Sequence, residues 1–277
     1  MPPSTEHLHL HQRDFLSTPV RGALRAWLET LCPLWEDRYS SRVPPRSGQT
    51  SRRLLRPVYW LGNWQFACLE YYRPPEGVTD RCVRAEPFPP LLASLVQEIE
   101  ALAHARYSGA DLPAGWTLNT CLINLYGVRR VEDRWVDSGR VRAHKDFEPG
   151  PVASLSLGER ALFQFVENNY PEQPGEVLAE HWLGDGALQL FGGEYWKERT
   201  LHCVTRVERS GGHRFQFPLS DFQTRRVNFT FRYVPEEHIV AYPDLSAQAR
   251  ADVREYLETL AHRSLFYAEA LAKAPAT

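Results

Sequence analysis

The chain has 277 residues, of which 43% are hydrophobic and 24% charged, a composition typical of a globular fold with a sizeable core. The formal net charge of -2 excludes a general attraction to nucleic acid, so contact with a polyanion has to come from local basic patches. Five cysteines without a CxxC pair argue against a disulfide framework or zinc ribbon and favour a reducing compartment, and no apolar run approaches the roughly 18 residues of a membrane span.

The first elements of the chain are a polar segment and a helix. We expect residues 1–18 to be a mobile tail. Its alternation of His7, His9 and His11 fits a metal site or, as the favoured interpretation, a solvated or loosely paired strand. Residues 21–35 are expected to form an amphipathic helix, because apolar side chains recur at helical spacing: Leu24, Trp27, Leu28 and Leu31.

A basic segment follows, without an acidic residue between Arg38 and Arg56. Its prolines, glycine and serines indicate a loop. Six guanidinium groups on a loop fit a phosphate clamp, and equally a solvated surface. The arginines are Arg38, Arg42, Arg46, Arg52, Arg53 and Arg56.

Residues 58–72 are rich in aromatic side chains, and Gly62-Asn63 indicates a hairpin turn between two strands. These rings near arginines would suit stacking of an extruded base, although most such aromatics are core. They are Tyr59, Trp60, Trp64, Phe66, Tyr71 and Tyr72. A helix is then predicted from Pro89-Pro90 to about Ala105.

The centre of the chain is rich in short strand signals separated by Gly, Pro and Asp turns, which predicts a sandwich or barrel. After Pro243, residues 246–273 carry a helical apolar stripe, in one helix or in two with a break near 262–264. The predicted strands are 117–126, 141–146, 152–157, 161–166, 177–182, 187–191, 201–207, 215–218 and 226–233.

The central candidate site is His144-Lys-Asp146. On an extended segment these two side chains point to one face and can share a metal ion. A second imidazole would complete the set of two histidines and one carboxylate used by non-haem Fe(II) oxygenases. His202, from another apolar strand, is preferred as this ligand over His181 and His213.

A second pattern, Arg226-Val-Asn228-Phe-Thr230-Phe-Arg232, places its polar residues on one strand face and its apolar ones on the other. Arg226 and Arg232 are six steps apart, so at roughly 3.3 Å per step their Cα atoms lie about 20 Å from each other. Long side chains leaning inward would be able to hold opposite ends of one small dicarboxylate.

In these motifs the chain resembles the AlkB-like Fe(II)/2-oxoglutarate-dependent dioxygenases, over about residues 119–233. The order of the matching blocks carries the resemblance, since an HxD motif alone is weak evidence. The blocks are Cys121-Leu-Ile-Asn124-Leu-Tyr126, His144-Lys-Asp146, Ser154-Leu-Ser156-Leu-Gly158 with Phe163-Gln-Phe165, Gly184-Asp185, Phe191-Gly-Gly-Glu194, His202 and Arg226-Val-Asn228-Phe-Thr230-Phe-Arg232.

The resemblance implies an α+β fold with a double-stranded β-helix, or jelly roll, and flanking helices. It implies His144, Asp146 and His202 as ligands of Fe(II), with O2 as co-substrate. The 2-oxoglutarate residues would be Arg226, Asn228 and Tyr126 at the distal carboxylate, and Arg232 and Asn124 near the metal. We expect the core at 119–234, a substrate-recognition region at 19–118 and a helical extension at 235–277.

The function implied is oxidative N-demethylation of alkylated DNA or RNA bases, releasing formaldehyde, succinate and CO2. The same chemistry on a protein side chain or small molecule is the alternative, and a jelly roll without turnover is a third. Candidate substrate contacts are Glu148, Trp60, Arg52, Arg53 and Arg130, with Arg129, Arg134, Arg140 and Arg142 as further phosphate contacts. We expect a monomer in the cytoplasm, or in the nucleus if the protein is eukaryotic, with no membrane contact.

Overall fold

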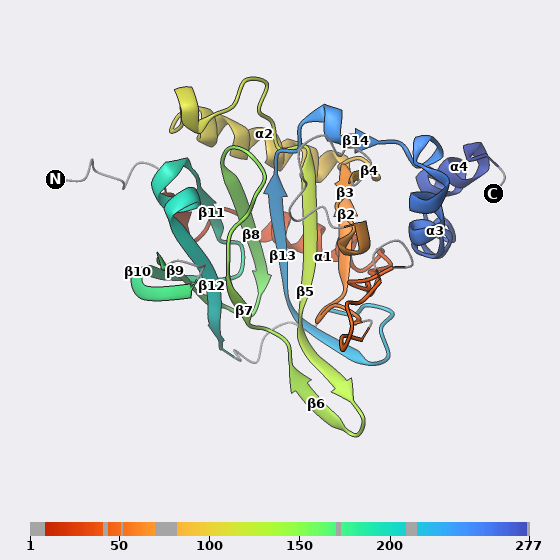
Figure 1. Ribbon diagram of the computed structural model, residues 1–277. Coiled ribbons are helices and arrows are strands. Elements are labelled where there is room, and N and C mark those ends of the chain that lie inside the picture. The colour runs from red at the N-terminus through yellow and green to blue at the C-terminus, as the bar shows by residue number, and fades with distance from the viewer. Residues whose placement is uncertain are drawn as a thin grey trace.

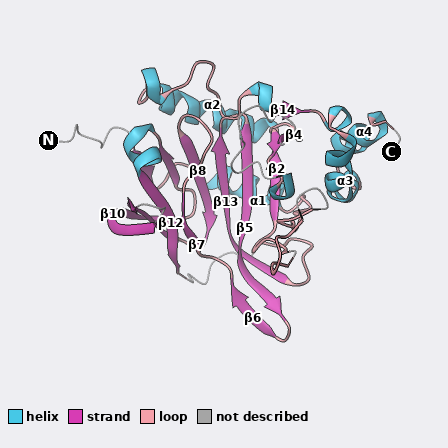
Figure 2. Cartoon of the chain, viewed as in Figure 1, coloured by secondary structure: helices cyan, strands magenta, loops and turns pink. Residues whose placement is uncertain are grey.

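Two antiparallel sheets face each other, and helices cover the outer side of the larger one (Figure 1, Figure 2). The structure is a computed structural model that describes residues 9–40, 44–50, 52–69, 82–169, 173–208 and 215–275. The predicted α+β fold, with a jelly-roll core and flanking helices, is confirmed.

The larger sheet has the order β1-β11-β8-β13-β5-β2, with β6 paired to β5. Its strands are β1 (His9–Gln12), β2 (Val58–Leu61), β5 (Thr120–Val131), β6 (Arg134–Asp137), β8 (Val152–Gly158), β11 (Leu188–Phe191) and β13 (Phe222–Arg232). The facing sheet has the order β10-β9-β12-β7. Its strands are β7 (Val141–His144), β9 (Ala161–Asn169), β10 (Gln173–Leu183) and β12 (Thr200–Val207). A small third sheet contains β3 (Asn63–Trp64), β4 (Cys82–Arg84) and β14 (Ile239–Val240).

The helices are α1 (Thr18–Leu28), α2 (Pro90–His104), α3 (Ala247–Ala261) and α4 (Leu265–Lys273). The predicted helix at 21–35 begins three residues earlier and ends at Leu28. Pro33 lies shortly beyond that end, and a proline disfavours helix both at its own position and at the residue before it. The helix after Pro89-Pro90 is confirmed, and the C-terminal stripe is two helices with the break at 262–264.

Successive side chains of strand β13 point alternately to the hydrophobic core and to the candidate site. Val227, Phe229 and Phe231 are fully buried in the large core cluster between the sheet and the helices. Their neighbours Arg226 and Asn228 line a cavity between the two sheets. One strand therefore supplies both an apolar face for folding and a polar face for chemistry.

Two local predictions were wrong. Gly62 does not make a hairpin, because β2 pairs with β5 while β3 pairs with β4. Gly62 has φ +77°, and a Cβ there would lie 1.9 Å from the carbonyl oxygen of Asn119, so a glycine is needed where the chain changes sheet. Residues 215–218 alternate in burial as a strand would, yet they form a loop.

The predicted N-terminal tail contains an edge strand. Residues 9–12 form β1, which pairs with β11, in agreement with the strand interpretation of the histidine alternation. His7 lies outside the described residues. The rings of His9 and His11 lie 4.9 and 4.3 Å from the ring of His181 on β10, so three imidazoles meet where β1 joins the body.

These histidines predict a loss of stability in acid. Burial, followed by neighbouring histidines, lowers the pKa of His9 to about 3 and that of His181 to about 4. Between their ordinary pKa of 6.5 and these values the unfolded chain binds more protons, so the free energy of unfolding falls as pH drops through this window. Urea unfolding at about pH 7.5 and about pH 5 should show a smaller pH effect in His181→Gln than in the wild type. Equal pH effects would contradict this assignment.

Candidate active site

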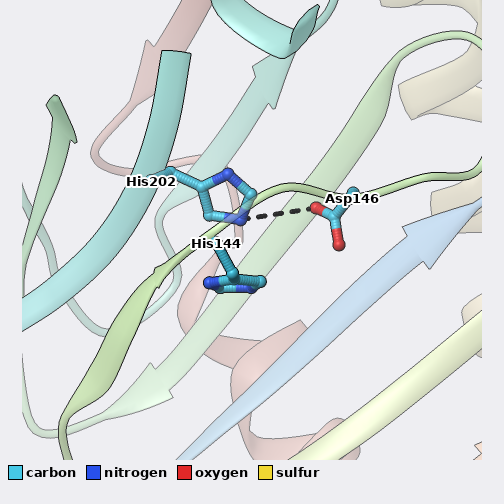
Figure 3. Close-up of side chains that lie close together, drawn as sticks. All are labelled: His144, Asp146 and His202. Atoms are coloured by element: carbon cyan, nitrogen blue, oxygen red, sulfur yellow. Dashed lines mark ion pairs between the residues drawn. The ribbon is translucent and has the colours of Figure 1, made fainter. Parts of the chain in front are cut away.

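His144, Asp146 and His202 lie close together (Figure 3), and all three line the cavity between the two sheets. His144 ends β7, Asp146 follows two residues later, and β12 pairs with β7 so that His202 stands opposite His144. One potential ligand atom from each residue lies within 4.8 Å of the other two. The sheet register thus brings together residues that are 58 positions apart in the sequence.

Hydrogen bonds orient two of these side chains for metal binding. Nδ1 of His144 donates to the carbonyl oxygen of Arg142 at 2.8 Å, which leaves Nε2 as the ligand nitrogen. Asp146 Oδ1 accepts from Arg232 Nη2 at 2.6 Å, while its Oδ2 lies 3.4 Å from His202 Nε2. The carboxylate is therefore fixed between a guanidinium and an imidazole.

The charge states suit the same purpose. Burial lowers the pKa of His202 to about 3, so the imidazole is neutral and has a lone pair to donate. Burial alone would raise the pKa of Asp146, but Arg232 and the two histidines outweigh it and hold that pKa below its usual range. Two neutral imidazoles and one carboxylate are the donor set that Fe(II) takes in oxygenases, with three coordination positions left open.

A second group of polar side chains lies on the adjoining floor of the cavity, on β5, β8 and β13. Arg226 is 1% exposed, and its Nη2 donates to Ser156 Oγ at 2.9 Å and to Asn228 Oδ1 at 3.2 Å. Its guanidinium carbon lies 4.9 Å from the centre of the Tyr126 ring. Asn228 Nδ2 in turn donates to Ser154 Oγ at 2.9 Å.

Arg226 retains unused hydrogen-bonding capacity. Its Nε and Nη1 are buried and have no hydrogen-bond partner among the described residues. A buried cation with two unsatisfied donors is costly, and a carboxylate satisfies both donors with charge-assisted bonds. The site therefore fits an anionic ligand at the Arg226 end and a cation at the His144 end.

Both groups of residues line one cavity of about 380 Å³. The three metal-ligand candidates are in its wall, and so are the five predicted 2-oxoglutarate residues: Asn124, Tyr126, Arg226, Asn228 and Arg232. Of the rival third ligands, His181 lies in the cluster with His9 and His11, and His213 lies outside the described residues.

Of the five substrate contacts predicted from sequence, one lines the cavity. Glu148 lines the cavity, with Oε1 accepting from Gln65 Nε2 at 2.9 Å and Oε2 lying 3.5 Å from Arg232 Nε. The prediction that Trp60 contacts the substrate was wrong. Trp60 is 1% exposed and donates its indole N–H to Glu36 at 2.7 Å, so it belongs to the core.

Most of the other aromatics predicted at 58–72 are core as well. Tyr59, Trp64 and Phe66 are buried in the large cluster, while Tyr71 and Tyr72 lie outside the described residues. The arginines Arg52, Arg53 and Arg130 are exposed and are not among the residues that line the cavity. They lie outside the cavity wall, and their contact with substrate phosphates stays a prediction.

The structure adds three residues to the predicted site. Arg56, predicted only as part of a phosphate clamp, and Ser154 line the cavity, while Ser156 lies beside it and accepts from Arg226. Arg56 lies over the Tyr126 ring at 4.5 Å, on an aromatic side chain that Arg226 also approaches. Ser154 and Ser156 hold the amide of Asn228 and the guanidinium of Arg226. The alternation of Ser154-Leu-Ser156 was the available signal, since both serines fall on the same strand face as the cavity.

Comparison with known proteins agrees with this geometry. The family model described as the 2OG-Fe(II) oxygenase superfamily matches residues 11–232, and the chain belongs to this superfamily. It is accordingly an Fe(II)- and 2-oxoglutarate-dependent dioxygenase, with O2 as co-substrate, and the predicted enzyme class is confirmed.

Among solved structures, one titled "The structure of OsALKBH1" is similar at a TM-score of 0.48 and 17% identity, over 82% of this chain and 98% of that one. No curated protein matches the sequence. Among the described residues, the helices are too short or too polar to cross a membrane.

Proposed function

We propose that the protein oxidatively removes an alkyl group from a nitrogen of a nucleobase in DNA or RNA. The observation that supports this most is the shared cavity, which presents a triad for Fe(II), a buried arginine for a dicarboxylate, and the carboxylate of Glu148. The order of motifs, which resembles AlkB-like dioxygenases, supports the nucleobase as substrate. We also propose that residues 119–234 are the catalytic core, with 19–118 and 235–277 flanking it.

Each group has a distinct task in this proposal. His144, Asp146 and His202 hold the iron, which, when bound, supplies oxidation of the alkyl carbon by O2 coupled to conversion of 2-oxoglutarate into succinate and CO2. Arg226 and Asn228 orient the distal carboxylate of 2-oxoglutarate. An N-hydroxymethyl group formed on the substrate then breaks its C–N bond, giving formaldehyde and a base with its N–H restored.

The residues around the cavity are suited to a polyanionic substrate. Arg56 and Lys145 line the cavity, and Arg142, which accepts the His144 hydrogen bond through its carbonyl, is exposed. Cations at this position favour phosphates near the reacting base. The buried Glu148 offers an acceptor for a hydrogen-bond donor of the base edge, and it is held in place by Gln65.

The test is product analysis with iron-loaded protein, 2-oxoglutarate, O2 and a set of N-methylated oligonucleotides. We expect formaldehyde and succinate in equal amounts, together with loss of the methyl group from one type of base. Succinate formation that none of the oligonucleotides stimulates, without formaldehyde, would contradict the nucleobase proposal and leave the dioxygenase class intact.

One observation favours a second candidate, the same chemistry on a protein side chain or a small molecule. The net charge of -2 is lower than is usual for a dedicated nucleic-acid protein. Methylated peptides and free methylated nucleosides in the same assay separate this candidate from the first. Formaldehyde from a peptide, with none from oligonucleotides, would establish it.

A further inference from the structure

A two-stranded finger extends from the body of the protein below β5 (Figure 1). It is made by the end of β5 and by β6, which pairs with β5 between Val128 and Val131. Its apolar side chains are unusually exposed: Trp135 is 47% exposed and Val136 is 48% exposed. Exposed tryptophan is uncommon because its burial is strongly favourable, so its place on a protruding strand calls for a partner.

The strand register shows to which side each of these residues points. Asn124 and Tyr126 of β5 line the active-site cavity, and by the period of two Arg130 shares their face. Trp135 stands directly opposite Arg130, and residues directly opposite in an antiparallel pair point the same way. Trp135 and Arg130 therefore continue the cavity face of the sheet onto the finger.

Val136 points to the other side. It stands opposite Arg129, whose guanidinium lies 5.8 Å from the ring of Trp35, in the N-terminal region outside the cavity. The finger thus has one face that continues the site, with Trp135 and Arg130, and one face that does not, with Val136 and Arg129.

The base of the finger adjoins the cavity. Residues 138–140 join β6 to β7, the strand that ends at His144. Arg56, a cavity residue, donates to the carbonyl oxygen of Arg140 in this connection at 3.1 Å. Arg130 lies four residues beyond Tyr126, about 13 Å at roughly 3.3 Å per residue. This is the length of about four stacked nucleotides at roughly 3.4 Å each.

We infer that the Trp135 face of the finger binds an unpaired stretch of the nucleic acid whose modified base enters the cavity, an inference that rests on the proposed function. The indole stacks on a base about four nucleotides from the reacting one, at roughly 3.4 Å per nucleotide, and any base sequence permits such stacking. Arg130 forms an ion pair with a phosphate of the nucleic-acid backbone. Its present partner Asp133, at 3.4 Å, is 97% exposed, and such a pair is weak enough for a phosphate to replace it.

The test measures binding of a fluorescent oligo(dT) of about 12 nucleotides to the full protein at several salt concentrations. Trp135→Ala should weaken binding by about 5- to 150-fold, the loss expected for one stacked base, without changing the dependence on salt. Arg130→Ala should reduce the salt slope by about 1, as removal of one phosphate contact does. Val136→Ala is the matched control and should leave both unchanged.

The outcomes separate the inference from the proposed function. Trp135→Phe should restore most of the binding, and all variants should melt at the wild-type temperature, since the side chains are exposed. If Trp135→Ala and Val136→Ala bind alike while the wild type demethylates oligonucleotides, the finger inference fails and the proposed function stands. If the wild type neither binds nor demethylates any oligonucleotide, both fail.

Discussion

His144→Ala is expected to lose Fe(II) and, with it, the conversion of 2-oxoglutarate to succinate, by at least about 100-fold. The imidazole stands opposite His202 across β7 and β12, and its Nδ1 is already committed to the carbonyl oxygen of Arg142. Removal leaves one imidazole and one carboxylate, too few for the three-ligand face. Iron content after anaerobic loading and succinate release measure the two losses separately.

His181→Ala is the matched control for this variant. His181 was a rival third ligand. It is partly buried on β10, in the same sheet as β7 and β12, and it lies outside the group formed by His144, Asp146 and His202. The control should keep its iron at neutral pH. Iron retained by His144→Ala, or lost equally by both variants, would contradict the assignment of the ligands.

The parts of the site that could be predicted from sequence are those governed by strand periodicity. Alternation on β13 placed Arg226 and Asn228 on one face and the phenylalanines on the other, and the structure has them so. The spacing of His144 and Asp146 carried the same information for the metal group. These are local rules, and they hold once a residue lies on an extended segment.

The interpretation of the aromatic segment was wrong at Trp60 because burial depends on distant partners. Trp60 and Trp64 both donate their indole N–H to Oε1 of Glu36 at 2.7 Å. Glu36 itself is buried, which raises its pKa to about 7. A carboxylate more than twenty residues away thus satisfies two indoles inside the core, and no local pattern reveals that pairing.

Asp185 is a second residue whose partners lie too far away in the sequence to be predicted from a local pattern. The Gly184-Asp185 motif contributed to the family resemblance, but the motif alone predicts no role for the carboxylate of Asp185. In the structure the carboxylate binds Arg25 Nη2 at 2.7 Å and Arg21 Nη1 at 3.3 Å, and it accepts from the Gly158 N–H at 2.9 Å. The Asp185 carboxylate therefore connects α1 to the end of β8. Arg25 and Asp185 are 160 positions apart, so this contact forms only in the folded chain.

Arg226→Met is expected to raise the KM for 2-oxoglutarate by about 10²- to 10⁴-fold, with a much smaller change in kcat. The variant removes the two buried donors, Nε and Nη1, that have no partner among the described residues. Each charge-assisted hydrogen bond contributes about 1.5–3 kcal/mol, so two account for that range. Arg226→Lys should recover little, because an ammonium does not reproduce a two-pronged contact with a carboxylate.

The same variant distinguishes a ligand-binding arginine from a structural one. A buried guanidinium with unsatisfied donors costs stability in the free protein, so Arg226→Met should melt at the wild-type temperature or above it in the absence of 2-oxoglutarate. Added 2-oxoglutarate should then raise the melting temperature of the wild type and not that of the variant. A variant that unfolds more easily, and whose KM for 2-oxoglutarate is unchanged, would instead assign Arg226 to the fold.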